Sequence, residues 1–123
     1  MAEHNDIGKY GEQKVCEYLA EHGYEILANN WHVGSSEVDI IAVKNGILCF
    51  VEVKTRTSAY FGAPEVFVTK TKQKNIIAAA DKYVSIHHRS EEIRFDIASV
   101  LIQNKQTSIH YIPDAFRSSW KRK

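Results

Sequence analysis

The sequence predicts one α/β domain in which a mixed β-sheet of about five strands is flanked by helices. Its 123 residues are enough for one hydrophobic core but too few for two. Apolar residues recur at helical spacing in two segments, and five shorter segments have the apolar runs or alternation typical of strands. An Asn-Gly pair separates two of these strand-like segments, which is the strongest short-range signal for a hairpin. The expected order is α-β-β-β-α-β-β.

The first helix is expected over about residues 6–22, with Asn5 or Asp6 as its cap and Gly23 at its stop. The residues at helical spacing in this segment are Ile7, Tyr10, Val15, Tyr18 and Leu19. A short strand is expected to follow over residues 24–33.

Two further strands, over 37–44 and 47–55, are expected to form a hairpin around Asn45-Gly46. A two-residue type I′ turn needs positive φ twice, which favours Asn followed by Gly. Both faces of these strands are apolar, which is typical of central strands. One face is expected to carry Ile41, Val43, Leu48 and Phe50, and the other Val38, Ile40, Ala42, Cys49, Val51 and Val53.

The second half of the chain is expected to complete the sheet. Its elements are a connection over 56–68, a helix over about 70–87, and strands over 94–102 and 107–112. In the connection, Tyr60 and Phe61 are candidates for core packing or for stacking on bases. We expect the domain to span residues 1–112, and residues 113–123 to form a basic tail.

The composition excludes several classes of protein. No apolar run reaches eighteen residues, so no membrane span is expected, and the polar N-terminus lacks the apolar stretch of a secretory signal. Cys16 and Cys49 have no metal-type spacing, and the six histidines show no ligand spacing either. No glycine-rich phosphate loop or nucleophile elbow is present. The expected compartment is the cytoplasm.

The hairpin turn also fixes a register. If Lys44 pairs with Ile47, then Asp39 lies directly opposite Glu52, and Glu37 lies opposite Lys54. Directly opposed side chains have Cβ atoms roughly 5 Å apart on one face of the sheet. The sequence therefore predicts two carboxylates side by side, with a lysine next to them.

Like charges in this arrangement repel each other unless a partner neutralises them. Carboxylate oxygens suit Mg²⁺, which keeps several waters and recruits phosphate oxygens of a substrate. The alternative is a satisfied salt-bridge cluster in which Lys54 neutralises Glu52 and Glu37.

Two helical residues bear on the same site. Glu12 lies at the flank of the apolar face of the first helix, where it reaches the sheet edge or simply pairs with a nearby lysine. Gln73 falls on the apolar face of the second helix, in its first turn, where helix N-termini favour anions. Its alternative role is that of a half-buried glutamine bonded to backbone.

Local basic patches stand out against a net charge of only +1. Candidates for gripping phosphates without reading sequence are Lys9, Lys14, Arg56, Lys70, Lys72 and Lys74. A second group, at the end of the chain, consists of Arg117, Lys121, Arg122 and Lys123. Both groups are equally typical of a solvated helix face and a frayed tail.

The spacing of Asp39, a hairpin turn and Glu52-Val53-Lys54 resembles the motif of the PD-(D/E)XK nuclease superfamily, with Val38 in place of the proline. Within that superfamily the chain resembles the small bacterial YraN-type family over about residues 6–103. The shared context comprises Gly11-Glu12, residues 37–42, 50–56, Phe61-Gly62, Pro64-Glu65, Lys72-Gln73 and Arg94-Phe95-Asp96. The resemblance implies a restriction-endonuclease-like core.

By the same resemblance, Asp39, Glu52 and the Val53 carbonyl would hold Mg²⁺ or Mn²⁺. Lys54 would orient the attacking water or stabilise charge on the phosphate, and Glu12 would be an additional ligand or would hold a metal-bound water.

The expected function is that of a metal-dependent endonuclease-like hydrolase acting on phosphodiester bonds in DNA, including branched or damaged DNA. One alternative is a nucleic-acid-binding module with the same fold that does not cut alone, needing a protein partner or a homodimer to grip a duplex. Another is an interaction protein in which the charged cluster is only structural.

Overall fold

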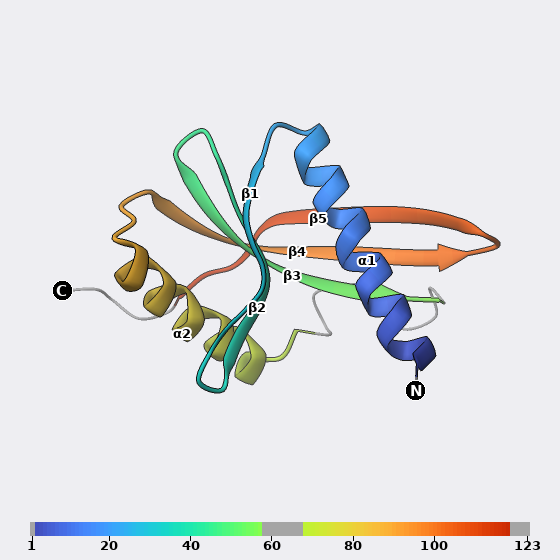
Figure 1. Cartoon of the computed structure of the whole chain (residues 1–123), viewed down its shortest axis with the longest axis horizontal. Helices are drawn as coiled ribbons and strands as arrows, with labels where there is room; N and C mark the ends of the chain where they lie inside the picture. Colours follow the sequence, from blue (N-terminus) through green and yellow to red (C-terminus); the bar gives the residue numbers. More distant parts are fainter. Residues whose placement is uncertain (1, 58–67, 119–123) are drawn as a thin grey trace.

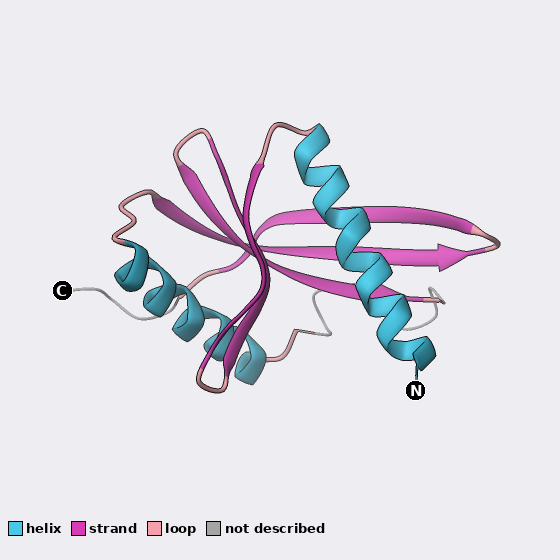
Figure 2. Cartoon of the chain, in the orientation of Figure 1, coloured by secondary structure: helices cyan, strands magenta, loops and turns pink. Residues whose placement is uncertain are grey.

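The computed structural model describes residues 2–57 and 68–118, which form one five-stranded sheet with a helix on each face (Figure 1). The elements are α1 (Ala2–Glu21), β1 (Glu25–Val33), β2 (Ser36–Lys44), β3 (Ile47–Arg56), α2 (Lys70–His87), β4 (Glu92–Gln103) and β5 (Gln106–Phe116). Figure 2 shows the same arrangement by secondary structure. The predicted mixed α/β class and element order are confirmed. The candidate residues Tyr60 and Phe61, and the basic residues 121–123, lie outside the described ranges.

The strands lie in the sheet in chain order, β1-β2-β3-β4-β5. Neighbouring strands are antiparallel except for β3 and β4, which are parallel. A parallel pair needs a crossover connection, and here the connection contains α2. The neighbours β2, β3 and β4 are therefore central strands, as the apolar faces of residues 37–55 predict.

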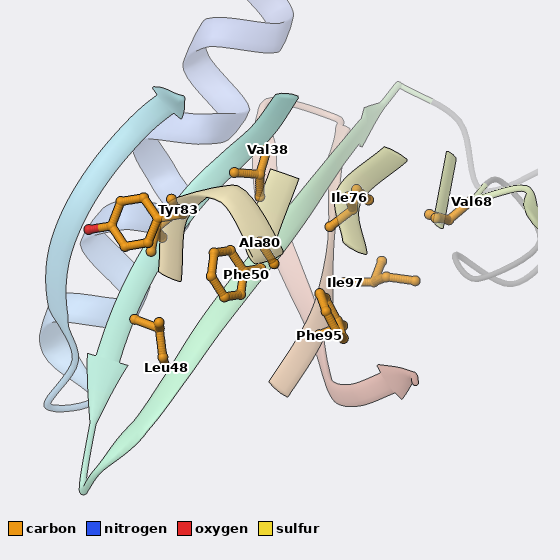
Figure 3. Packing of buried hydrophobic residues seen from close by; sticks show 10 residues of the cluster. Val38, Leu48, Phe50, Val68, Ile76, Ala80, Tyr83, Phe95 and Ile97 are labelled. Atoms are coloured by element: carbon orange, nitrogen blue, oxygen red, sulfur yellow. The ribbon is translucent and has the colours of Figure 1, made fainter. Parts of the chain in front are cut away.

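Two apolar clusters separate the helices from the sheet. On one face, Ile76, Ala80 and Tyr83 of α2 pack against Phe50 and its neighbours on the sheet (Figure 3). On the other face, Val15 and Leu19 of α1 pack against a second set of sheet residues, which are Ile40, Ala42, Cys49, Val51, Ala98 and Val100. The sheet is thus buried on both faces at its centre.

The helices differ in how well the sequence predicts their ends. α2 has the predicted bounds, because Thr69 caps its first turn by accepting a hydrogen bond from Lys72 N at 3.2 Å. α1 begins at Ala2, four residues before the predicted start, because Asn5 and Asp6 continue the helix instead of capping it. Neither helix of the described chain is long and apolar enough to cross a membrane.

Close contact between α1 and β3 depends on one glycine. A Cβ atom added to Gly11 would lie 1.8 Å from Thr55 Oγ1, so a larger residue there would have to displace the helix or the threonine. The contact seats α1 directly over the strand that carries Glu52 and Lys54.

The last strand is longer than predicted. β5 continues through Pro113 to Phe116, so the expected domain boundary at residue 112 falls inside a strand. Proline is tolerated there because β5 is an edge strand, and an irregularity in the β4–β5 register lies between Phe95 and Ile97. Asp114 adopts a positive φ of 55° near this irregularity.

Candidate active site

The hairpin between β2 and β3 has the predicted turn and register. Asn45 and Gly46 have φ values of 53° and 76°, and Lys44 pairs with Ile47. The ladder runs outward from the turn and ends at the pair between Ile40 and Val51. Asp39 and Glu52 are the next residues on the two strands, so the site forms where the strands stop pairing.

Beyond the Ile40–Val51 pair, a side chain replaces the backbone ladder. The Val53 N–H donates to Asp39 Oδ2 at 2.8 Å. This bond anchors the Asp39 carboxylate between the two strands and satisfies a backbone donor that a regular ladder would have paired with β2.

The separation of the strands changes two predicted positions. Val38 was expected on the same face as Ile40, but it packs in the cluster with Phe50 on the α2 side (Figure 3). The expected opposition of Glu37 and Lys54 is also wrong, because the β2–β3 ladder ends at Ile40 and Val51 before it reaches them. Glu37 is paired on its other side with His32 of β1, with His32 Nε2 and Glu37 Oε1 2.8 Å apart. Both differences follow from the loss of regular alternation around Asp39.

The Asp39 and Glu52 carboxyl groups lie within hydrogen-bonding range of each other, so one can donate to the other when it carries a proton. Glu52 is buried, with 3% of its surface exposed. Burial, together with the negative charge of Asp39, raises the pKa of Glu52 to about 7. Burial also raises the pKa of Asp39, although its bond from the Val53 N–H opposes that rise. The predicted adjacency of the two acids is confirmed, and the pair favours holding a proton.

The cation at this pair comes from α2. Lys72 Nζ lies 3.1 Å from Glu52 Oε2. Burial alone would lower the pKa of Lys72, but the charges of Glu52 and Asp39 raise it. The predicted neutralisation of Glu52 by Lys54 is therefore not what the structure shows. Lys72 was predicted as a phosphate contact, and its ion pair depends on a contact between α2 and β3 that no local pattern reveals.

Lys54 lies two residues beyond Glu52 on β3, so the two side chains share the α2 face of the sheet. Lys54 is half-buried, as is Arg56 two residues further on. The strand thus presents a carboxylate, an ammonium and a guanidinium in succession on one face.

Glu12 approaches the pair from α1. It is half-buried and hydrogen-bonded to the side chain of Asn30. Burial and the charge of Asp39 raise the pKa of Glu12, while the bond with Asn30 lowers it. The structure therefore brings Glu12 within electrostatic range of the site, on the side predicted from its helical position.

The remaining predicted residues are spread over the two helices. Gln73 is half-buried and donates from Nε2 to the Val68 carbonyl at 3.0 Å, which is the backbone-bonded alternative. Lys14 Nζ is 3.5 Å from Glu17 Oε1 and lies over the ring of Tyr10. Exposed lysines complete the set, namely Lys9 on α1 and Lys70 and Lys74 on α2.

The oxygen atoms gathered at the site are of the chemical type that hard cations prefer. Within residues 2–57 and 68–118, no three His, Cys, Asp or Glu side chains are gathered closely enough to form a metal group. Two touching carboxylates remain, and with a backbone carbonyl and waters they fit Mg²⁺ or Mn²⁺, since Mg²⁺ retains much of its hydration. The fit is to a water-rich ion and not to a closed protein cage.

A second buried carboxylate, Asp96 on β4, was not predicted as a centre. Its oxygens accept hydrogen bonds from Arg94 Nε and Nη2, each at 2.9 Å, from the Tyr111 hydroxyl, and from Asp114 N at 2.9 Å. Arg94 Nη2 also donates to the Tyr24 hydroxyl at 2.8 Å. The alternation of arginine and aspartate in Arg94-Phe95-Asp96 is the sequence signal for this network, which joins β4, β5 and the start of β1.

Fold and site together define a mixed α/β protein in which a buried and a half-buried carboxylate lie together where two central strands separate, bordered by lysines from β3 and α2. The chain belongs to the family described as "Uncharacterised protein family UPF0102", whose model matches residues 11–100. The predicted membership in the YraN-type family is thereby confirmed.

Relatives match over nearly their whole length. A UPF0102 protein from Flavobacterium psychrophilum is 47% identical over 116 residues, covering 94% of this chain and 98% of the relative. A UPF0102 protein from Bacteroides thetaiotaomicron is 44% identical, covering 94% and 96%. A UPF0102 protein from Flavobacterium johnsoniae is 41% identical, covering 94% and 98%.

Proposed function

We propose that the protein is a metal-dependent endonuclease-like hydrolase that cleaves phosphodiester bonds in DNA. The observation that carries the proposal is the closeness of Asp39 and Glu52, a half-buried and a buried acid held side by side at the point where β2 and β3 stop pairing. A pair of this kind is stable only with a shared proton or an added positive charge. A divalent cation supplies that charge and brings a phosphate substrate with it.

Asp39 and Glu52 would hold Mg²⁺ or Mn²⁺, joined by the carbonyl of Val53. Such an ion, when bound, polarises a phosphodiester and lowers the pKa of a bound water. The Val53 N–H already fixes Asp39 at 2.8 Å, so the acid is oriented before any ligand arrives. Glu12 approaches the pair from α1 and would orient a water through its carboxylate.

The lysines would act on the substrate. Lys54 follows Glu52 on the same face of β3, where its ammonium would stabilise negative charge that develops on the phosphate. Lys72 holds Glu52 from α2 at 3.1 Å, so it competes with any cation for that carboxylate and becomes available to a phosphate once displaced. The exposed lysines of the two helices would add contacts to flanking phosphates.

The test is cleavage of linear and branched DNA with Mg²⁺ or Mn²⁺, together with calorimetric titration of the same ions. We expect Asp39→Asn and Glu52→Gln each to lower cleavage about 100-fold or more, the size typical of losing a group that stabilises transition-state charge. Metal affinity should fall with them. Lys54→Gln should lower cleavage while leaving metal affinity close to that of the unmodified chain.

The matched control is Glu17→Gln, an exposed acid on α1 that should change neither cleavage nor metal affinity. Retention of full cleavage by Glu52→Gln would refute the proposed site. Tight binding of DNA by the unmodified chain, with no cleavage in either metal on any substrate, would instead identify a binding module.

A further inference from the structure

Beyond Glu52, polar residues on β3, β4 and β5 stand in register across the sheet. Lys54 pairs with Ser99, and Ser99 pairs with His110. One step further along the strands, Arg56 pairs with Leu101, which pairs with Ser108. Side chains two residues apart on a strand share a face, so all of these residues lie on the face that carries Glu52.

All of these residues except Lys54 border a hollow. A cavity of about 280 Å³ is lined by Arg56, Ser99, Leu101, Ser108, Ile109 and His110. Ser99 is buried, with 5% of its surface exposed, whereas Ser108 and His110 are exposed. The hollow therefore has a polar floor on β4 and open walls on β3 and β5.

No described helix covers this part of the sheet. α2 packs over β1, β2 and the parts of β3 and β4 that carry Phe50, Glu52 and Phe95, while α1 lies on the opposite face of the sheet (Figure 1). A sheet centre in an α/β protein is normally covered on both faces, and an uncovered face that is polar and cationic favours a charged ligand. Among the described residues of β3 beyond Glu52, the charged side chains on this face are the cationic Lys54 and Arg56.

We propose that Lys54, Arg56, Ser99, Ser108 and His110 form a cross-strand strip that binds the phosphate backbone of a nucleic-acid strand beside the carboxylate pair. Strands lie about 4.8 Å apart, so the three strands span roughly 10 Å, enough for two or three phosphates of one strand. The inference rests on the proposed function, and it assigns the direction of the bound strand, across β3 towards β5.

The test uses opposite charge changes at Ser108, because this exposed position on β5 can accept them without loss of the fold. The probe is a fluorescent 12-nucleotide single-stranded DNA, measured by anisotropy in EDTA at 50–200 mM salt. Ser108→Lys should tighten binding about 3- to 10-fold and steepen the salt dependence by about 0.7 in log–log slope, as one added phosphate contact would. Ser108→Glu should weaken binding about 3- to 10-fold.

Ser85→Lys and Ser85→Glu, on the exposed side of α2, make the same changes in net charge away from the strip. They should change affinity less than twofold. Equal effects at Ser85 and Ser108, or no effect at Ser108, would overturn the strip. An RNA of the same sequence should bind with the same ranking of variants, since the strip contacts phosphates. Because EDTA removes divalent ions, this assay measures binding without cleavage. If the variants bind as expected but the chain never cleaves DNA, the proposed strip stands and only the proposed hydrolysis is refuted.

Discussion

The two buried carboxylate centres of this molecule differ in how completely their charge is matched. Asp96 is fully buried, and its two oxygens accept four hydrogen bonds, two of them from Arg94. At the other centre, Asp39 and Glu52 place two acids against each other, with Lys72 as the cation in contact. One centre is neutral and closed, and the other carries more acid than base.

The difference teaches which buried acid is structural and which is available to a ligand. A charge with all its hydrogen-bond positions filled gains nothing from a new partner, so Asp96 can only hold strands together. A pair of acids that favours a shared proton gains from any added cation. Each centre contains a buried carboxylate, Asp96 in one and Glu52 in the other, and the two differ in how many hydrogen-bond donors face their acids.

The largest expected effect is at the closed centre. Asp96→Ala should lower the free energy of unfolding by about 3 to 5 kcal/mol, because it removes a fully buried carboxylate and leaves the half-buried Arg94 without its ionic partner. Denaturation in urea measures the loss. Asp6→Ala, an exposed position on α1, is the control and should cost well under 1 kcal/mol. A loss at Asp96 no larger than at Asp6 would mean that the network does not hold the sheet together.

The open centre should instead make stability depend on pH. Folded Glu52 keeps its proton up to about pH 7, whereas the ordinary value is 4.5, so the folded state binds more protons between these limits. Stability contributed by that proton is therefore lost as the pH rises from about 4.5 through 7. Across this window, the free energy of unfolding of the unmodified chain should fall by on the order of 2 to 3 kcal/mol relative to that of Glu52→Gln.

This difference is measured by urea denaturation of the two proteins in EDTA at several pH values. The exposed variant Glu17→Gln should follow the unmodified chain throughout. Parallel curves for the unmodified chain and Glu52→Gln would show that the acids do not share a proton, and the contrast with Asp96 would disappear.

A smaller effect probes one donor of the closed centre. Tyr111→Phe removes the hydroxyl that donates to Asp96, while Arg94 and Asp114 N remain. A hydrogen bond to a charged group contributes about 1.5 to 3 kcal/mol, so the loss of stability should lie in that range and below that of Asp96→Ala. The matched control is Tyr10→Phe, which removes an exposed hydroxyl that lies 3.1 Å from Thr107 Oγ1. Equal losses for the two tyrosines would show that the Asp96 network is not special.

The sequence was sufficient to predict those features of the Asp39–Glu52 centre that depend on residues close together in the chain. Asn45-Gly46 fixes the turn, the turn fixes the register, and the register places Asp39 beside Glu52. The exact bounds of α2 follow in the same way from a local cap. These are short-range rules, and each depends on residues close together in the chain.

What sequence did not predict depends on contacts between distant elements. The bond from Val53 N–H to Asp39 replaces the ladder and turns Val38 to the other face, and alternation alone cannot foresee it. Lys72 reaches Glu52 only because α2 crosses over to that part of the sheet. The closed network around Asp96 likewise joins residues from β4, β5 and the start of β1, so Arg94-Phe95-Asp96 gave a hint but no partners.

The smallest expected effect tests whether Lys72 stands in for the cation at the open centre. Lys72 Nζ contacts Glu52 Oε2 at 3.1 Å, so a divalent ion must compete with an ammonium already in place. Lys72→Met keeps the length of the side chain and removes its charge. It should bind Mn²⁺ about 3- to 10-fold more tightly in calorimetry, a gain of about 1 kcal/mol that matches a partly exposed ion pair. Lys82→Met, an exposed lysine further along α2, should leave Mn²⁺ affinity unchanged. Weaker binding in Lys72→Met would mean that Lys72 supports the metal site instead of competing for it, and the two centres would then differ less than their donor counts imply.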